Sequence, residues 1–354
     1  MLHIERYTDS VIAEILLRKR QYDGQLVTSV FFGGGTPSLL TPSALSSICD
    51  ALRQSYNISS EAEWTMECNP GTVSIESLSA YHNQGINRLS FGVQSFTPSE
   101  LLFLDRIHSA DDAVNAMTMA RSAGFDNVNM DLMFAVPGQT IESLRYNINR
   151  MIALCPEHIS AYSLIYEHGT PLYAKLKKGL IKPLSEDVDA HMYKLVIDAL
   201  SNAGYHQYEV SNFAKQGKQC RHNLTYWHAN PYLAFGPSAH GFVGGIRYWN
   251  KRSLTSWMAD ISESILPEAN RETLSEQEAL SEYLFLHLRA DGVPIDTVEQ
   301  TFGIDLRTAL QPNLAYWIEE GFVSDSENIL RLTAEGYRVC DELSLKVIEA
   351  VEAL

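Results

Sequence analysis

Short apolar runs alternate with longer amphipathic segments along the first half of the chain. The apolar runs predict strands, because five of them have strand length and contain few charges; they lie at 26–32, 64–68, 88–94, 128–134 and 158–165. Each run precedes a segment of helical periodicity that opens on a cap residue; the expected caps are Thr41, Ser74, Thr97, Ser109 and Thr140. The segment "TPSE" at 97–100 predicts a capping box. Strand followed by helix, repeated in this way, predicts an α/β fold with a parallel sheet.

The first pattern in the chain is helical. Ile12, Ile15 and Leu16 lie on one face of a predicted helix, and no strand pattern precedes it. A β/α series that begins with a helix has either lost its first strand or gained a capping helix. The pattern alone leaves both interpretations open.

The chain divides into three predicted domains. Residues 1–168 hold the strand–helix repeats, 169–273 contain a long helix and a segment rich in aromatic residues, Gly and His, and 274–354 are mainly helical. In the last domain we expect helices at 275–289, 294–303 and 306–320, then a hairpin and a terminal helix, an arrangement that resembles a winged helix. This domain carries 16 acidic and 5 basic residues, so we do not expect it to bind DNA.

Composition narrows the functional classes. The net charge of −16 over 354 residues argues against nucleic-acid partners. No apolar run reaches the roughly 18 residues that span a bilayer, and no secretory leader opens the chain. The cysteines are too scattered for a disulfide framework, which predicts a cytoplasmic protein; they are Cys49, Cys68, Cys155, Cys220 and Cys340.

Polar residues gather near the predicted strand ends. "GGGTP" follows the first strand at 33–37, and Glu67, Gln94 and Asp131 interrupt the next three strands near their carboxyl ends. Taken singly, the loop is a tight turn and each polar residue is a satisfied core residue. Together they favour one shared polar ligand, because the carboxyl ends of parallel strands meet at one edge.

Several of these segments also carry a family resemblance. The segments "FFGGGTPSLL", "MECNPGTV", "GINRLSFGVQSF", "LDRIHS", "NMDLMFAVPGQT" and "RHNLTYW" occur in order. They resemble the radical S-adenosylmethionine (SAM) proteins related to oxygen-independent coproporphyrinogen III oxidase, and within them the HemW-type heme chaperone branch. The resemblance runs from about residue 5 to the C-terminus. It implies a partial (β/α)6 radical SAM barrel that lacks its first strand.

The resemblance also implies a cofactor site. Residues Gly34, Gly35 and Thr36 would hold the methionyl end of SAM. The rest of the pocket would be formed by Glu67, Gln94, Arg106 and Asp131. Carboxylates suit the ammonium or the ribose hydroxyls of SAM, and an arginine suits an anionic group.

One defining motif of the family is absent from the printed sequence. Family members hold a 4Fe-4S cluster on C-x-x-x-C-x-x-C after the first strand, and this chain has no such motif. We expect either that the coding region starts upstream of Met1, which we favour, or that the cluster has been lost. In both cases the chain as printed has no metal ligands for a cluster and should not perform radical chemistry.

A second candidate site lies at 220–227, "CRHNLTYW". The string His-Asn-x-x-Tyr-Trp is typical of the heme chaperone branch, which implies His222 as an axial heme ligand with Tyr226 and Trp227 against the macrocycle. The alternatives are a structural histidine, a Cys220 thiolate ligand, or ligation by another histidine, the competitors being His206, His228 and His240.

Three functions follow from the resemblance. The first is a heme chaperone that binds heme and SAM and transfers heme to an acceptor protein, for which a respiratory protein is one option. The second is oxygen-independent coproporphyrinogen III oxidase, a decarboxylase of porphyrin biosynthesis, and the third is a degenerate scaffold without catalysis. The His-Asn-x-x-Tyr-Trp string favours the first. The sequence leaves a homodimer open.

Overall fold

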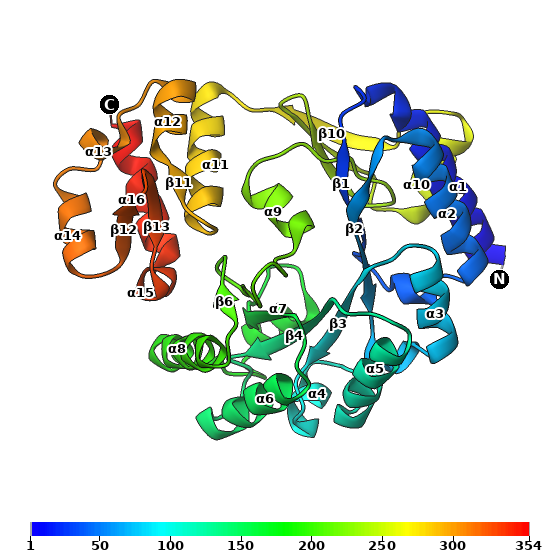
Figure 1. Cartoon of the computed structure of the whole chain (residues 1–354), viewed down its shortest axis with the longest axis horizontal. Coiled ribbons are helices and arrows are strands. Elements are labelled where there is room, and N and C mark those ends of the chain that lie inside the picture. Colours follow the sequence, from blue (N-terminus) through cyan, green and yellow to red (C-terminus); the bar gives the residue numbers. More distant parts are fainter. Residues whose placement is uncertain (1, 354) are drawn as a thin grey trace.

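A seven-stranded sheet forms the centre of the computed structural model, which describes residues 2–353 (Figure 1). The strand order is β1–β2–β3–β4–β5–β7–β6. Strands β1 to β5 pair in parallel, whereas β7 and β6 pair antiparallel at one edge. The bounds are Val27–Phe32 (β1), Ile58–Cys68 (β2), Arg88–Gln94 (β3), Val128–Phe134 (β4), His158–Ser163 (β5), His206–Gln207 (β6) and Asn212–Ala214 (β7).

The predicted strands β3 and β4 have the expected bounds, but β2 begins six residues earlier than expected. Its first four residues are partly or fully exposed and mostly polar, so an apolar run does not mark them. Strand β5 ends two residues early, at Ser163. The α/β fold with a parallel sheet is confirmed, and the five predicted strands form its parallel part, while β6 and β7 add an antiparallel edge that the sequence did not predict.

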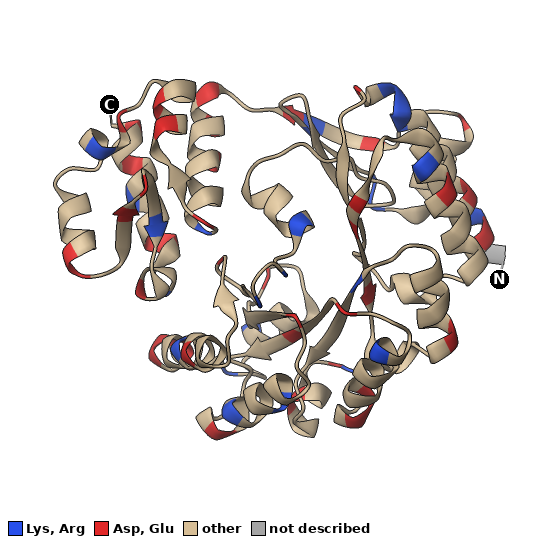
Figure 2. Ribbon diagram, viewed as in Figure 1, with Lys and Arg blue, Asp and Glu red and all other residues tan. Residues whose placement is uncertain are grey.

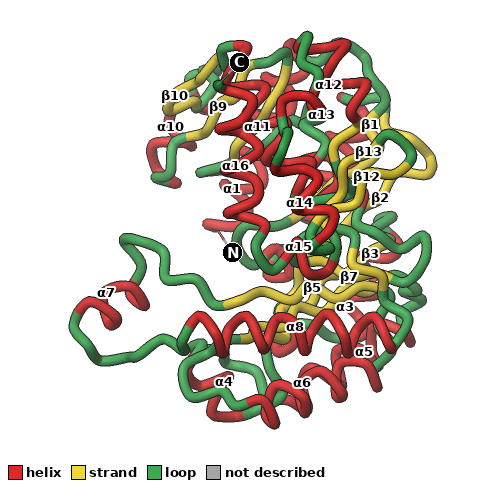
Figure 3. Tube along the Cα trace, turned by 90° about the vertical axis from the view of Figure 1, so that its left-hand side faces the viewer, coloured by secondary structure: helices red, strands yellow, loops and turns green. Residues whose placement is uncertain are grey.

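Helices cover the outer face of the sheet, as Figure 1 shows. Four of the predicted caps are confirmed: Thr41, Ser74, Ser109 and Thr140 each accept a hydrogen bond from a backbone N–H three residues on. The helices of this part are α1 (Leu2–Arg18), α2 (Pro42–Ser55), α3 (Ile75–Asn83), α4 (Pro98–Phe103), α5 (Ala110–Ser122), α6 (Ile141–Ala153), α7 (Pro171–Lys177) and α8 (Glu186–Asn202). Helix α7 lies on an extended arm (Figure 3).

The capping box predicted at 97–100 is wrong. Thr97 makes no side-chain cap bond at the start of α4. Glu100 turns into the core instead, where its carboxylate accepts from the Ser95 hydroxyl at 2.6 Å and the Asn147 amide at 2.7 Å. Buried side-chain donors thus compete successfully with the local cap.

A second, antiparallel sheet lies beside α1, with order β10–β9–β8. Its strands are His240–Val243 (β8), Ile246–Asn250 (β9) and Glu268–Thr273 (β10), and its helices are α9 (Arg221–Trp227) and α10 (Leu254–Ser262). Trp257 and Ile261 of α10 are buried in the same apolar core as the helices of the parallel sheet. One core therefore extends from α1 to α10.

The C-terminal part has a separate core of buried residues between Leu280 and Val351. Its three-stranded sheet has the order β11–β13–β12. The expected helix at 306–320 is broken into α13 and α14 because Pro312 lies between them. The elements are α11 (Glu276–Leu288), β11 (Val293–Pro294), α12 (Ile295–Phe302), α13 (Leu306–Ala309), α14 (Asn313–Glu319), β12 (Val323–Ser326), β13 (Ile329–Leu332), α15 (Ala334–Tyr337) and α16 (Cys340–Glu352).

The C-terminal part is attached to the rest through the β6–β7 connection and α8. The Val210 N–H donates to the Arg289 carbonyl at 2.8 Å, and Lys194 pairs with Glu335 at 3.0 Å. Acidic residues are spread over its helices (Figure 2). The winged-helix likeness, the three domain boundaries and the missing first strand stay predictions. Between residues 2 and 353, no helix is long and apolar enough to cross a bilayer.

Candidate functional site

The glycine-rich loop after β1 lies against the Glu67 side chain. The Gly34 N–H donates to Oε2 of Glu67 at 3.1 Å. A Cβ on Gly33 would lie 2.9 Å from the Glu67 carboxyl carbon and 2.5 Å from Cε1 of Phe31, so a larger residue there would displace one of these side chains. Gly34 has a φ of +83°, which glycine adopts without steric cost. Residues 33–36 are exposed, so the loop backbone is open to a ligand.

A second group of predicted residues surrounds Gly92 of β3. A Cβ on Gly92 would lie 3.2 Å from Nε2 of Gln94, 4.0 Å from NH1 of Arg106 and 4.0 Å from Oδ2 of Asp131. Side chains from β3, from the loop after α4 and from β4 therefore converge on one point of the inner face. A larger residue at Gly92 would fill the space between them.

Two carboxyl groups dominate the electrostatics of this inner face. Burial raises the pKa of Glu67, the Gly34 N–H lowers it, and the Asp131 carboxylate raises it again. Burial also raises the pKa of Asp131, although the Asn129 amide donates to it at 2.7 Å. Each carboxylate would be relieved by a nearby positive charge. The arrangement is therefore suited to a cationic ligand.

The structure brings five of the seven residues predicted for SAM into this arrangement: Gly34, Glu67, Gln94, Arg106 and Asp131. Gly35 and Thr36 lie in the same exposed loop. A Cβ on Gly35 would meet no atom within 4 Å among the described residues. The predicted roles of Gly35 and Thr36 in SAM binding therefore depend only on their being part of the exposed loop backbone.

Helix α9, which carries the second candidate site, is fastened by Glu63 of β2. One carboxylate oxygen of Glu63 accepts from the Arg221 N–H at 3.1 Å. The other accepts from the His222 N–H at 3.2 Å and from the Cys220 thiol at 3.3 Å. Glu63 is 6% exposed, so these are charge-assisted bonds in a buried setting. They fix α9 against the inner face of the sheet.

The imidazole of His222 is held on three sides. Its Nδ1 lies 3.0 Å from the Ser29 hydroxyl and its Nε2 lies 2.8 Å from the Tyr226 hydroxyl. The ring stacks on Phe31 with centroids 4.9 Å apart. Phe31 also borders Gly33, so the two candidate sites adjoin through this one side chain.

Burial sets the protonation of both candidate heme ligands on α9. Burial lowers the pKa of His222 to about 4, against the opposing effect of Glu63, so the imidazole is neutral at pH 7 and keeps one lone pair. Burial raises the pKa of Cys220 to about 11, so its thiol stays protonated. Because a cysteine ligates as the thiolate, His222 is the better ligand of the two.

Further aromatic rings continue from His222. Tyr226 meets Tyr232 edge to face with centroids 4.5 Å apart, and Tyr232 lies 6.5 Å from Phe242 of β8. Tyr226 is 40% exposed, and Trp227 is partly buried at the end of α9. Ligation through Nε2 of His222 would require the Tyr226 hydroxyl to give up its hydrogen bond.

Sequence reasoning missed Glu63, Thr65, Arg88 and Asn129, which share the inner face with the predicted residues. The signal was the alternation in "EWTME": Glu63, Thr65 and Glu67 recur at every second position and so point to one side of β2. Only Glu67 was recognised: Glu63 precedes the strand predicted from residue 64, and Thr65 was not singled out within it.

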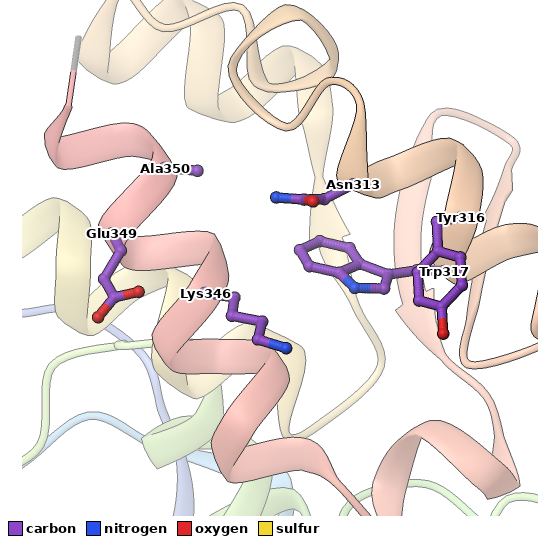
Figure 4. Close-up of a pocket in the computed structure, with 6 residues that line it drawn as sticks. All are labelled: Asn313, Tyr316, Trp317, Lys346, Glu349 and Ala350. Atoms are coloured by element: carbon purple, nitrogen blue, oxygen red, sulfur yellow. The ribbon is translucent and has the colours of Figure 1, made fainter.

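A hollow of about 400 Å³ lies elsewhere, in the C-terminal part (Figure 4). Helices α14 and α16 face each other across it, and its lining residues are Asn313, Tyr316, Trp317, Lys346, Glu349 and Ala350. None of the residues predicted for SAM or heme lines it. We therefore assign it no part in the candidate site.

Comparison with known proteins identifies the family. The heme chaperone HemW of Bacillus subtilis is 34% identical over 342 residues, which cover 96% of this chain and 90% of the relative. The chain belongs to the HemW family. The HemW of Mycobacterium tuberculosis (strain H37Rv) is 36% identical over 292 residues, which cover 82% of this HemW-family chain and 75% of the relative.

The domain families and the fold agree with this assignment. The Radical SAM superfamily matches residues 3–150, and the HemN C-terminal domain matches residues 274–339. Among solved structures, coproporphyrinogen III oxidase (HemN) of Escherichia coli superposes with a TM-score of 0.81 at 22% identity. The superposition covers 99% of the HemW-family chain and 83% of HemN, which shows that the two share a fold.

The residues of this HemW-family chain fit one of the cofactors that the radical SAM superfamily implies. Glu67 and Asp131 are suited to the positive charge and hydroxyl groups of SAM, and Arg106 is suited to its carboxylate. The 4Fe-4S cluster does not fit: the five cysteines are free and scattered, and in the described part of the chain no group of three His, Cys, Asp or Glu could hold a metal ion.

Proposed function

We propose that this HemW-family chain binds SAM at the carboxyl ends of β1 to β4, binds heme at α9, and transfers the heme to an acceptor protein. The observation that carries the proposal is the pair of carboxylates, Glu67 and Asp131, which are partly buried on one inner face and form no ion pair among residues 2–353. A ligand with a sulfonium and an ammonium supplies the missing positive charge.

The proposed roles follow the chemistry of each side chain. Glu67 and Asp131 bind the ammonium group and the ribose hydroxyls. Arg106 binds the carboxylate of the amino-acid portion, and Gln94 provides both a donor and an acceptor. The loop at 33–36 brings backbone N–H groups close to the ligand, because its glycines have no side chains to hold the ligand away.

For heme, the neutral imidazole of His222 offers its lone pair to the iron when Tyr226 turns away. Ser29 holds the other ring nitrogen and Phe31 holds the ring plane. These two contacts fix the orientation of the imidazole, as hydrogen bonds to ligating histidines do at other metal sites. No step is assigned to a 4Fe-4S cluster. All five cysteines are free, which is typical of cytoplasmic proteins, and we propose that the chain works in the cytoplasm. A respiratory heme protein is the proposed acceptor.

Heme titration tests the role of α9. We expect the Soret band of added heme to shift on binding, and the shift to be lost in His222→Ala while His206→Ala, on the exposed start of β6, keeps it. Because the pKa of His222 is about 4, the affinity should be constant from pH 8 to about pH 5 and fall below that. Loss of the shift in His228→Ala, with His222→Ala unaffected, would assign the ligand to another histidine.

Calorimetric titration with SAM tests the strand-end site. Glu67→Gln and Asp131→Asn should each weaken binding by about 10-fold or more, since each removes a charge-assisted contact. Glu61→Gln is the matched control, because Glu61 lies on the same strand and is exposed. Equal affinities in all four proteins would contradict the site, and decarboxylation of coproporphyrinogen by the chain would replace the chaperone with the oxidase.

A further inference from the structure

A buried arginine on the inner face of the sheet has no partner. Arg88, the first residue of β3, is 2% exposed, and its Nε has no hydrogen-bond partner. No ion pair or side-chain hydrogen bond found between residues 2 and 353 includes it. Arg18 of α1 is the contrast, because all three of its nitrogens are bonded although it too is fully buried.

A second unpartnered group lies directly beside Arg88. Thr65 of β2 is paired with Arg88 in the parallel ladder, is fully buried, and has a hydroxyl without a partner. Both side chains lie on the inner face, because the alternate residues Leu89 and Phe91 are buried in the apolar core. Two neighbouring strands thus carry unpaired polar side chains at paired positions of the sheet.

The titratable side chains around Arg88 are already committed to other partners. The nearby carboxylates are bound elsewhere: Glu63 to the start of α9, Asp131 to Asn129, and Glu209 to the Ser211 N–H and the Asn212 amide. The positive charge of Arg88 nevertheless acts on several neighbouring groups. It opposes the rise that burial causes in the pKa values of Asp131, Tyr208 and Cys220, and it adds to the lowering of those of His158 and His222. Arg88 therefore lies within electrostatic range of both candidate sites.

We propose that Arg88 and Thr65 form the binding site for a carboxylate of a ligand that enters the barrel. A buried, unpaired guanidinium is costly, and a carboxylate compensates it with two parallel hydrogen bonds, to which the threonine hydroxyl adds a third. This inference rests on the proposed function, which supplies two carboxylate sources: the amino-acid portion of SAM and the propionates of heme.

The position of Arg88 favours a heme propionate. Arg88 is six residues before Gln94 on β3, which corresponds to roughly 20 Å along a strand. Arg106 lies beside Gln94 and Asp131 and is the nearer arginine for the SAM carboxylate. Arg88, unlike Arg106, also acts on the pKa values of His222 and Cys220 of α9. The propionate is therefore the expected occupant.

The first test compares heme with its dimethyl ester, which has no carboxylates. The wild-type protein should bind the ester about 10- to 100-fold more weakly, the usual effect of losing a charge-assisted contact. Arg88→Gln should lower the affinity for heme to that for the ester and leave ester binding unchanged, with Arg88→Lys in between. Arg145→Gln, an exposed arginine of α6, is the matched control and should behave as wild type.

Two further titrations identify the source and separate this inference from the proposed function. SAM is compared with decarboxylated SAM; a difference that disappears in Arg88→Gln, with heme and its ester equal, would keep the site but assign it to SAM. Sodium propionate is compared with sodium chloride at equal ionic strength in thermal unfolding. Stabilisation of wild type but not of Arg88→Gln by propionate supports the site even if neither heme nor SAM binds.

The inference is overturned if heme and its ester bind equally to wild type, SAM and decarboxylated SAM bind equally, and propionate stabilises wild type and Arg88→Gln alike. The two ligand comparisons need only the wild-type protein, and Arg88→Lys takes the place of Arg88→Gln in the propionate test if that variant does not fold.

Discussion

Two regions of this molecule hold charged side chains away from solvent, and they differ in how many hydrogen-bond partners they give them. Beside the second sheet, the Glu14 carboxylate accepts four hydrogen bonds at 2.7–3.0 Å, from Arg18, Asn250, Gly236 and Trp257. On the inner face of the parallel sheet, the Glu67 carboxylate has one backbone donor, the Gly34 N–H.

This difference distinguishes a hydrogen-bond network that holds the fold together from a site that can bind a ligand. The network of Glu14 fastens α1 to β9, α10 and the loop before β8, and leaves its carboxylate no capacity for a ligand. The inner face is incompletely paired at Glu67, Asp131 and Arg88, so it gains more from a charged ligand than the network could. A buried charge suggests a function when its partners are too few, and a structural role when they are complete.

The largest expected effect comes from breaking the complete network. Glu14→Gln keeps the shape of the side chain but turns an amide group toward donors and leaves Arg18 with a weaker set of partners. We expect the free energy of unfolding to fall by about 3–5 kcal/mol, as when one partner of a buried pair is removed. Urea unfolding measures it, with Glu5→Gln on the exposed side of α1 as the control.

Much of this fold follows from local patterns in the sequence. The strands at 88–94 and 128–134 and the caps at Ser74, Ser109 and Thr140 were predicted, because apolar runs and capping residues act over a few neighbouring positions. Three strand-end polar residues also identified a common edge, since parallel strands bring their carboxyl ends together.

The rest depends on contacts between distant segments, which no local pattern contains. The sequence places Glu100 in a capping box with Thr97, but its carboxylate accepts a hydrogen bond from Asn147, 47 residues away. Glu63 precedes the strand predicted from residue 64 and carries no local signal, yet it binds the start of α9 158 residues later. Arg88 has no sequence signal at all, because a guanidinium without a partner is recognised only when its surroundings are known.

An intermediate effect is expected in the glycine-rich loop beside Glu67. Gly34→Ala would force a side chain into φ +83°, which costs roughly 1–2 kcal/mol for a residue with a Cβ, although no atom lies within 4 Å of that position. Gly35→Ala is the matched control, because Gly35 is equally uncrowded and its φ is not positive. Thermal unfolding should separate the two variants, and SAM affinity should fall in the first. Equal behaviour would remove backbone conformation as the reason for the glycine.

The smallest expected effect has the opposite sign from that of Glu14→Gln. Because burial raises the pKa of Glu67 above its usual value of 4.5, the folded protein holds this proton more tightly than the unfolded chain. Ionisation as pH rises through the folded pKa therefore lowers stability, and the neutral Glu67→Gln avoids that loss. We expect the variant to gain about 0.5–1 kcal/mol at pH 8 without ligand, the usual scale for a single stabilising substitution, and to lose most of the gain near pH 4. Chemical unfolding at both pH values measures it, beside Glu61→Gln, which should stay within about 0.5 kcal/mol of wild type. A variant less stable than wild type at pH 8 would mean that Glu67, like Glu14, is held by a complete set of partners, and the distinction between the two regions would then be lost.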